Sequence, residues 1–374
     1  MRLGVVVEQL LGPVPGGTGR YTYELAAALA LTAPTGASVA GFVAWHRDLD
    51  PGRVTGVSGP RRLPVGRRPL AVCWERGLGP APRGVDVVLA PTLLAPPRRG
   101  RPLLVAVHDA VPWTHPQTLT PRGVSFHRRA GRRAAAQADA LLVPTSAVAA
   151  ELADHLRLRP GSVHVVGEGV SAALGAPPVD TSARARRLGL PAVYLLAVAT
   201  LEPRKGLDVL LTALADPAAP DLPLVIVGQP GWGGVDLGAA AASAGLPPSR
   251  VRELGRLDDP DLATVLHGAT ALAAPSRAEG FGLPVLEAMA AGVPVVSSDV
   301  PALAEVADGA TLLVPVNDAH ALALALHRIC TDSGLRQRLI DAGQVRAATF
   351  TWASAATRVW SIARDLGGSG RRPA

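Results

Sequence analysis

The chain has 374 residues, more than one hydrophobic core usually holds, so two domains are expected. Its two cysteines, Cys73 and Cys330, provide no disulfide framework, which argues against a small secreted scaffold and indicates a reducing compartment. The net charge of +7 favours an anionic partner, yet 3% aromatic content and no nucleic-acid motif argue against nucleic acid, so an anionic membrane surface or acceptor is expected.

The basic residues are unevenly placed and almost all of one kind. Residues 1–170 hold 20 arginines against 11 acidic residues, a net charge of +9, and the remainder has a net charge of −2. Of the 37 basic residues, 36 are arginine and one is lysine, Lys205. Most arginines therefore need no individual explanation, whereas Lys205 is a candidate for a role that requires a compact ammonium group.

The N-terminal residues predict neither a signal peptide nor a membrane span. The first apolar run ends by Glu8, too early for the core of a signal peptide, and no small-residue cleavage site follows. No apolar run approaches the roughly 20 residues that a spanning helix needs. We expect a cytoplasmic protein, peripheral at the inner face of the membrane if an anionic surface is its partner.

Short apolar runs alternate with helical stretches through the first domain, residues 1–170, which predicts a doubly wound parallel sheet. The expected strands are Leu3–Val7, Val39–Trp45, Val85–Leu89, Leu103–Val107, Leu141–Val143 and Val163–Val166. Residues 48–66 are expected to be mostly loop.

A glycine-rich loop follows the first strand and precedes a helix over residues 20–31. Gly17 and Gly19 form a partial G-x-G, but Thr22 stands where a dinucleotide-binding motif has its third glycine. No acidic residue follows at a suitable second strand end. This pattern argues against an NAD-dependent oxidoreductase. The simplest alternative to a binding loop is an ordinary tight turn between strand and helix.

His108 follows a buried strand directly. Ligands of open α/β sheets bind outside the carboxyl ends of the strands, so His108 is a candidate site residue. The alternative is a histidine that only hydrogen-bonds within its loop.

Two D-x-D sequences occur, Asp48–Asp50 and Asp259–Asp261. Such pairs can hold a metal–diphosphate, but both lie beside proline or glycine, where aspartates commonly cap helices and form turns. We interpret both as local structure and predict no metal site.

The helix expected over residues 120–138 carries five arginines, at positions 122, 128, 129, 132 and 133. Spacings of three and four place several of them on neighbouring turns of one face. This face is either simply solvated or a contact surface for anionic lipid.

Residues 171–190 contain Gly175, Pro177 and Pro178 and are expected to form a linker or hinge. A second doubly wound domain is expected over residues 191–350, followed by a helix over residues 351–366 and a disordered tail over 367–374. The expected strands of the second domain are Tyr194–Ala199, Leu222–Val227, Val251–Leu254, Leu272–Ala274, Val295–Ser298 and Leu312–Val314.

Two loops of the second domain carry distinctive residues. Arg204 and Lys205 precede a helix directly, and two cations beside a helix N-terminus suit a diphosphate group. Trp232 lies among four glycines after the next strand, which suits a lid or a base-stacking edge, or simple packing.

The most informative stretch is EGFGLPVLEAMAAGVPVV, Glu279–Val296. A glycine-rich turn leads into a helix whose first turn contains Pro284, where proline is tolerated. Backbone N–H groups and the positive end of the helix dipole make such a turn an anion site. The residues that supply it are Gly280, Phe281, Gly282 and Leu283. Glu279 and Glu287 flank this site.

This stretch resembles the E-x7-E donor-sugar motif of the retaining glycosyltransferases of family 4. The resemblance covers nearly the whole chain and is strongest from Val198 to Pro315. It implies the GT-B fold, two Rossmann-like domains facing a cleft, with a C-terminal helix that crosses back onto the first domain.

The resemblance also implies roles for particular residues. Glu279 would lie against the transferred sugar, and Glu287 would hold the nucleotide ribose. Arg204 and Lys205, in a segment similar to the family's EPRKN, would bind the donor diphosphate, although Gly206 replaces the usual asparagine.

In the first domain, His108 matches the family's HD pair and would lie near the donor sugar. Gly17 and Gly19 belong to a GGTGRY segment similar to the family's GG-x-GRY loop, which faces the cleft and the acceptor.

The implied activity is retaining transfer of a hexose from a nucleotide diphosphate sugar to an acceptor hydroxyl, without metal or cofactor. The motifs are most similar to those of mannosyl- and rhamnosyltransferases of polysaccharide or glycolipid assembly, so GDP-mannose is the donor expected first. The alternatives are a UDP-sugar-dependent transferase acting on a soluble acceptor, and a sugar-nucleotide- or lipid-binding protein without catalysis. A sugar-nucleotide epimerase of the same fold is a further enzymatic alternative. It is disfavoured because such epimerases do not resemble the EPRK segment.

Overall fold

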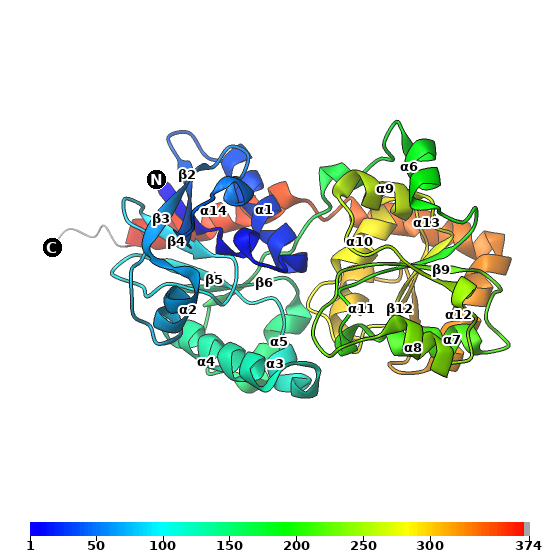
Figure 1. Ribbon diagram of the computed structural model, residues 1–374. Coiled ribbons are helices and arrows are strands. Elements are labelled where there is room, and N and C mark those ends of the chain that lie inside the picture. The colour runs from blue at the N-terminus through cyan, green and yellow to red at the C-terminus, as the bar shows by residue number, and fades with distance from the viewer. Residues whose placement is uncertain (370–374) are drawn as a thin grey trace. The chain divides into compact units, whose positions relative to one another are not determined.

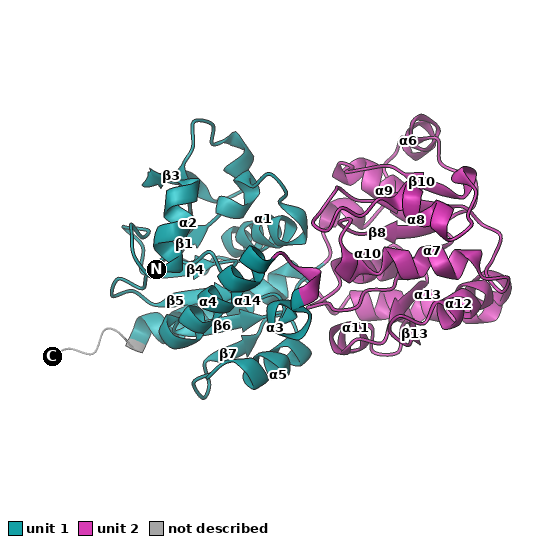
Figure 2. Cartoon of the chain, turned by 60° about the horizontal axis from the view of Figure 1, so that its bottom comes forward, with its two compact units in different colours: residues 1–116, 121–169, 351–374 teal, residues 117–120, 170–350 magenta. Residues whose placement is uncertain are grey.

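The chain, described by a computed structural model over residues 1–369, forms two compact units (Figures 1 and 2). Unit 1 contains residues 1–116 and 121–169 and the chain from Thr351 onward, and unit 2 contains residues 117–120 and 170–350. Each unit is built around one parallel sheet, which confirms the predicted fold class.

The sheet of unit 1 has seven parallel strands in the order β3-β2-β1-β4-β5-β6-β7. The strands are β1 (Arg2–Val6), β2 (Ser38–Trp45), β3 (Ser58–Gly66), β4 (Val87–Ala90), β5 (Leu103–Ala106), β6 (Ala140–Val143) and β7 (Val163–Val165). The strand order reverses between β1 and β4, which makes their carboxyl ends the topological switch point.

Helices cover both faces of this sheet. The helical segments are η1 (Glu8–Leu11), α1 (Gly16–Leu31), η2 (Asp50–Gly52), α2 (Arg67–Glu75), α3 (Val111–Thr114), α4 (Pro121–Gln137), α5 (Ser146–His155) and α14 (Trp352–Ser369). The short η3 (Pro116–Thr118) begins in unit 1 and continues into the residues assigned to unit 2. Buried residues of α2, α4 and α5 share one core with the strands. Helix α14 packs against α1, where the Trp360 indole N–H donates to the Leu29 carbonyl at 3.0 Å.

The sheet of unit 2 has six parallel strands in the order β10-β9-β8-β11-β12-β13. The strands are β8 (Leu195–Val198), β9 (Leu224–Val227), β10 (Val251–Glu253), β11 (Ala271–Ala274), β12 (Val295–Ser298) and β13 (Leu312–Val314). Here the order reverses between β8 and β11, so the loops that follow these two strands emerge side by side.

The helical segments of unit 2 are η4 (Ala172–Leu174), α6 (Thr181–Leu188), η5 (Pro203–Lys205), α7 (Leu207–Ala215), α8 (Leu237–Ser243), η6 (Pro248–Arg250), α9 (Asp259–His267), α10 (Leu283–Ala290), α11 (Pro301–Ala307), α12 (Ala319–Thr331) and α13 (Ser333–Ala347). Several begin at an aspartate whose carboxylate accepts a backbone N–H of the first turn, for example Asp258 at α9 and Asp318 at α12. Residues of α7, α8 and α12 share a core with the strands.

The loop predicted over residues 48–66 is wrong in its second half. Residues 58–66 form β3, although this stretch contains two prolines. Because β3 is the edge strand of its sheet, it tolerates residues that cannot complete a hydrogen-bonded ladder on both sides. Helix α2 follows it directly.

The segment 171–190 is more structured than a linker. It contains η4 and α6, and Leu174 is fully buried. Arg184 and Arg187 of α6 pair with Asp261 of α9, at 2.8 and 2.5 Å. The prolines that indicated a flexible stretch precede α6, and these contacts fix the segment on unit 2.

The chain returns to unit 1 between Phe350 and Thr351, and α14 begins at Trp352. The helix continues to Ser369, so the first residues of the tail expected to be disordered, 367–369, are helical. Residues 370–374 of that tail lie outside the described residues. Within residues 1–369, no helix combines the length and apolar character needed to cross a bilayer.

Candidate functional site

The topology of unit 2 brings together the residues singled out from its sequence. The loop after β8 carries Arg204 and Lys205, and the loop after β11 carries Glu279. Since β8 and β11 are neighbours at the switch point, both loops leave the same edge of the sheet.

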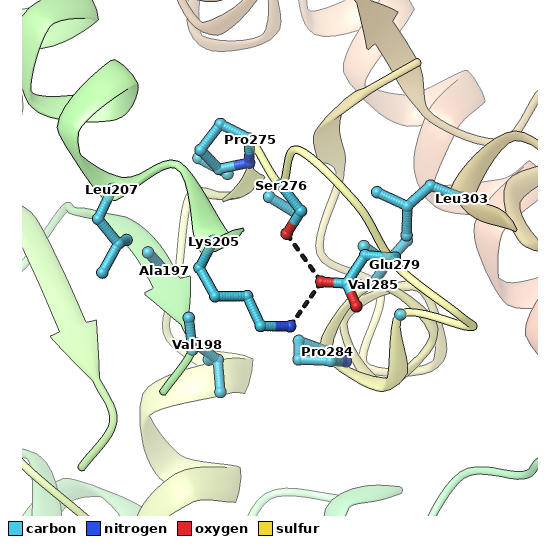
Figure 3. A pocket seen from close by; sticks show the side chains of 14 residues that line it. Ala197, Val198, Lys205, Leu207, Pro275, Ser276, Glu279, Pro284, Val285 and Leu303 are labelled. Atoms are coloured by element: carbon cyan, nitrogen blue, oxygen red, sulfur yellow. Dashed lines mark hydrogen bonds and ion pairs between the residues drawn. The ribbon is translucent and has the colours of Figure 1, made fainter. Parts of the chain in front are cut away.

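Glu279 is bonded to both cations (Figure 3 shows Lys205). The Lys205 ammonium Nζ lies 2.5 Å from Glu279 Oε1, and Arg204 Nη1 lies 3.0 Å from Oε2. The Ser276 hydroxyl donates to Oε1 at 2.7 Å. Arg204 also pairs with Glu202 at 2.7 Å, so two acids and two bases form one network.

The network sets the protonation state of Glu279, whose side chain is 11% exposed. Burial by itself would raise its pKa, but the charges of Lys205 and Arg204 outweigh burial and hold the pKa at about 2. Glu279 is therefore ionised at neutral pH. It can accept hydrogen bonds and stabilise positive charge, but it has no proton to give as a general acid.

Two glycines allow close packing at the site, one between the two loops and one against helix α11. Gly206 has φ +63°, and a Cβ there would lie 2.1 Å from the Pro275 carbonyl oxygen. Gly282 has φ +91°, and a Cβ there would lie 2.3 Å from Leu303 Cδ2. The glycine at 206, where the family pattern has asparagine, thus fits a position at which this chain leaves no room for a side chain.

A small cavity of about 20 Å³, with room for a water molecule, lies between these loops. Lys205, Glu279, Gly282 and Pro284 are among the residues that line it (Figure 3). Glu287 is not among the lining residues and lies buried inside α10, 4% exposed.

The turn before α10 contributes backbone groups rather than side chains. Gly280 and Gly282 have none, and the Phe281 ring packs edge-on against Phe350, with centroids 5.5 Å apart. Leu283 is buried at the first position of α10, and the first N–H groups of a helix have no acceptor within it. The turn is therefore suited to hold an anion by its N–H groups.

His108 lies in unit 1, two residues beyond β5, at the carboxyl edge of that sheet. Its Nε2 is 2.8 Å from the Pro91 carbonyl oxygen, and its Nδ1 is 3.8 Å from Glu168 Oε1. Tyr21 contacts the imidazole edge-on, with centroids 4.5 Å apart. Burial lowers the pKa of His108, but Glu168 and the Pro91 carbonyl outweigh it, so the pKa is raised overall.

Gly17 and Gly19 lie within the first turn of α1, not in a loop before it. Pro15 occupies the N-cap position, so the helix begins four residues earlier than the sequence indicated. Gly19 is buried, and a Cβ there would collide with Pro15 Cβ at 2.4 Å. A Cβ at Gly17 would meet nothing within 4 Å.

Asp48, Asp50 and Asp261 of the two D-x-D sequences have partners within their own unit. Asp48 accepts the backbone N–H of Asp50 at 2.9 Å, and Asp50 pairs with Arg53 at 2.8 Å. Asp261 pairs with the arginines of α6 described above. Among residues 1–369, no group of three or more histidine, cysteine or acidic residues is arranged to hold a metal ion.

Three of the five arginines of α4 make contacts inside unit 1. Arg128 donates to the Pro112 carbonyl at 2.8 Å, Arg129 pairs with Glu75, and Arg133 donates to the Ala95 carbonyl at 2.6 Å. Arg122 and Arg132 are exposed.

Three polar partners in these clusters were not assigned a role from sequence. Glu202 and Ser276 lie within the two segments that resemble the family motifs. Because they are close in sequence to Arg204 and Glu279, a role beside those residues could have been predicted for them. Glu168 is 60 residues from His108 in sequence, and only the neighbouring positions of β5, β6 and β7 explain their contact.

Two family profiles match the chain and together span most of it. The profile described as Glycosyltransferase Family 4 matches residues 15–174, and the one described as Glycosyl transferases group 1 matches residues 179–346. The matches correspond closely to the two units and confirm the resemblance stated from the motifs.

Curated relatives are 35–38% identical over part of the chain. A D-inositol 3-phosphate glycosyltransferase of Salinispora arenicola (strain CNS-205) is 38% identical over 58% of this chain and 52% of its own length. The phosphatidyl-myo-inositol mannosyltransferase of Mycolicibacterium smegmatis is 37% identical over 45% of this chain and 44% of its own. The O-antigen chain mannosyltransferase B of Escherichia coli is 35% identical over 44% of each chain. The matched part thus spans about half the length of these relatives.

Solved structures agree on the fold over nearly the whole chain. The sucrose-phosphate synthase of Thermosynechococcus elongatus superimposes with a TM-score of 0.78 at 22% identity, covering 99% of this chain and 100% of that one. Anabaena HepE in complex with UDP and glucose gives 0.75 at 20% identity, covering 98% and 100%. At these identities the likeness is one of fold.

We predict that Glu168→Gln lowers the pKa of His108. With its pKa raised in the folded state, protonated His108 stabilises unit 1 below the ordinary histidine pKa, and this contribution disappears as the pH rises through the folded-state pKa. NMR titration of the His108 ring, assigned by loss of its signal in His108→Gln, measures the shift. Glu75→Gln, which removes a surface carboxylate of the same unit, is the control, and an unchanged His108 pKa in Glu168→Gln would contradict the assignment.

Proposed function

Because this chain belongs to glycosyltransferase family 4, we propose that it transfers a hexosyl group from a nucleotide diphosphate sugar to an acceptor hydroxyl with retention of configuration. The observation that carries this proposal is the cluster of Arg204, Lys205 and Glu279 at the switch point of unit 2. Two cations and a carboxylate fixed at one position match the needs of a reaction whose leaving group is a diphosphate.

The reaction breaks the bond between the anomeric carbon and the diphosphate oxygen and forms a bond from the same carbon to the acceptor oxygen. Negative charge grows on the departing diphosphate, where Arg204, Lys205 and the N–H groups before α10 stabilise it. The acceptor proton passes to the departing diphosphate, so the protein need not supply a strong base. No resident cofactor takes part.

Glu279 has a different task in this scheme. Its pKa of about 2 in the free protein means that it meets the donor as a carboxylate, which can accept hydrogen bonds from the sugar hydroxyls and stabilise positive charge at the anomeric centre. Without donor it neutralises the same cations that the diphosphate needs, so donor binding exchanges one anionic partner of Lys205 and Arg204 for another. Glu287, farther along α10, would hold the ribose hydroxyls.

Mannose from GDP-mannose is the donor we propose first, because relatives of this chain are named mannosyltransferases. A UDP-sugar is the alternative, which the likeness to HepE, solved with UDP and glucose, favours. Thermal-shift measurements with GDP-mannose and UDP-sugars separate the two, because a ligand that binds the native state raises its unfolding temperature. Stabilisation by UDP-sugars alone would overturn the choice of mannose.

We propose that unit 1 binds the acceptor near Gly17, Gly19 and His108. The net charge of +9 over residues 1–170 and the raised pKa of His108 suit an acceptor or surface that carries negative charge. An anionic polysaccharide, glycolipid or soluble glycoside fits this description, and so does an inositol phosphate, the compound in the name of a relative of this chain.

We predict that Arg204→Ala and Lys205→Ala each lower turnover by roughly one to three powers of ten, the range expected when one preorganised charge is removed. Lys205→Arg should be partly active, because the planar guanidinium is larger than the ammonium group it replaces. Donor hydrolysis at saturating donor measures the effect. Wild-type rates in both alanine variants would exclude these cations from catalysis, and no turnover by the wild type with any donor it binds would favour a non-catalytic binding protein.

We predict that turnover survives removal of divalent metal, because Arg204 and Lys205 supply the positive charge that a metal would otherwise supply. The comparison is activity after exhaustive dialysis against EDTA, with and without added Mg²⁺ or Mn²⁺. Activity that is lost in EDTA and returns with metal would contradict this and would point to one of the D-x-D pairs.

We predict that the protein binds anionic vesicles reversibly through unit 1 and that this binding weakens as the salt concentration rises. Each basic group near such a surface contributes on the order of 1 kcal/mol, and salt screens the attraction. Arg122, Arg129 and Arg132 are the exposed arginines of α4, and Arg129 pairs with Glu75. Changing Arg122 and Arg132 to glutamate should therefore weaken binding without slowing donor hydrolysis. Sedimentation with neutral and anionic vesicles at two salt concentrations tests this prediction. Equal partitioning to the neutral and the anionic vesicles would favour a soluble acceptor.

A further inference from the structure

Arg277 links the two loops of the candidate donor site without belonging to the cluster of Arg204, Lys205 and Glu279. Its backbone N–H donates to the Arg204 carbonyl at 2.8 Å, and its guanidinium Nη1 donates to the Pro203 carbonyl at 2.5 Å. In return, Arg204 Nη1 donates to the Ala278 carbonyl at 2.9 Å. The loop after β11 is therefore joined to the loop after β8 by reciprocal hydrogen bonds.

The segment that Arg277 contacts is held mainly by polar groups. None of the three residues of η5, Pro203–Lys205, is fully buried, so hydrophobic packing does not fix this turn. Its position depends on polar contacts, and Arg277 bonds two of its three carbonyl groups. A shift of this turn moves the side chains of both Arg204 and Lys205.

The guanidinium is itself held on several sides. Asp208, in the first turn of α7, accepts from Nη1 at 2.9 Å and from Nη2 at 2.6 Å. Asn317 Oδ1, before α12, accepts from Nε at 2.7 Å. These acceptors use the planar fork of an arginine, which a lysine ammonium cannot reproduce.

We propose that Arg277 is a positioning residue that holds η5, and with it Arg204 and Lys205, in the place required to bind the donor diphosphate. The proposal rests on the function proposed above, in which these two cations bind that diphosphate. Arg277 acts through the backbone of η5 and does not contact the diphosphate itself.

The test compares Arg277→Gln with a matched variant elsewhere in the same unit. Arg250 pairs with Asp221 and donates to the Pro220 carbonyl at 2.6 Å, so it has the same kinds of partners as Arg277. It lies just before β10, whereas the site lies beyond the carboxyl ends of the strands. Arg250→Gln therefore reports what the loss of a comparable arginine does to stability alone.

Two measurements are made on the full chain. Hydrogen exchange in the free protein should become faster over residues 203–210 in Arg277→Gln and stay unchanged there in Arg250→Gln. Calorimetry with UDP and GDP should show affinity for the better-bound nucleotide falling about 10- to 100-fold in Arg277→Gln, as expected when binding groups are misplaced by about 1 Å. Arg277→Lys should behave like Arg277→Gln, and both should unfold at temperatures close to that of Arg250→Gln.

A coupling measurement separates positioning from general stabilisation. By itself, Asp208→Asn should weaken nucleotide binding. Combined with Arg277→Gln it should weaken binding little further, because both changes remove the same pairing between the Arg277 guanidinium and Asp208. Unchanged exchange over residues 203–210, or nucleotide affinity that falls equally in Arg277→Gln and Arg250→Gln, would overturn the proposal. If the wild type binds neither nucleotide, the proposed function fails, and hydrogen exchange alone then decides whether Arg277 positions the loop.

Discussion

The largely buried ion pairs of Glu279 with Lys205 and Arg204 are the interaction on which the candidate site depends. Removing one partner of such a pair leaves an uncompensated buried charge, which is far less stable than the intact pair. The pairs form because β8 and β11, separated in sequence by β9 and β10, are neighbours where the strand order of unit 2 reverses. The same contacts that join the two loops keep Glu279 ionised, so the architecture of the sheet and the chemistry of the carboxylate have one cause.

The positive and negative charges in the network around Glu279 balance one another. Glu202 and Glu279 neutralise Arg204 and Lys205, so the cluster carries no net charge before a ligand arrives. An anionic ligand gains little from long-range attraction to a neutral cluster, and it must instead replace a carboxylate as the partner of a cation. The N–H groups at the start of α10 add positive potential to that of the two cations. Recognition of a diphosphate would then depend on geometry as much as on charge.

In unit 1, as in unit 2, the candidate residues lie beyond the carboxyl ends of the strands, but here the central group is a histidine. His108 lies beyond β5, and its Nε2 bonds the carbonyl of Pro91, which follows the neighbouring strand β4. Its other ring nitrogen faces Glu168, which follows β7. Both nitrogens therefore face oxygen acceptors, an arrangement that favours the protonated ring and raises its pKa. The carboxyl edge of the first sheet thus carries a titratable ring whose protonated form its neighbours favour, in contact with Tyr21 of α1.

The sequence by itself determined the fold class, most strand positions, and the identity of Glu279, Arg204, Lys205 and His108 as candidates, because buried parallel strands are continuous apolar runs and glycine-rich turns have local signatures. It missed β3, since prolines weaken the pattern of an edge strand, and it treated residues 171–190 as a linker because the pairing of α6 with Asp261 joins distant positions. Only the tertiary structure decided that Glu279 is bonded to both cations, that Glu168 faces His108 and that Arg277 spans two loops. Each of these contacts joins residues 60 to 75 positions apart, and periodicity and motif spacing report only on neighbours along the chain.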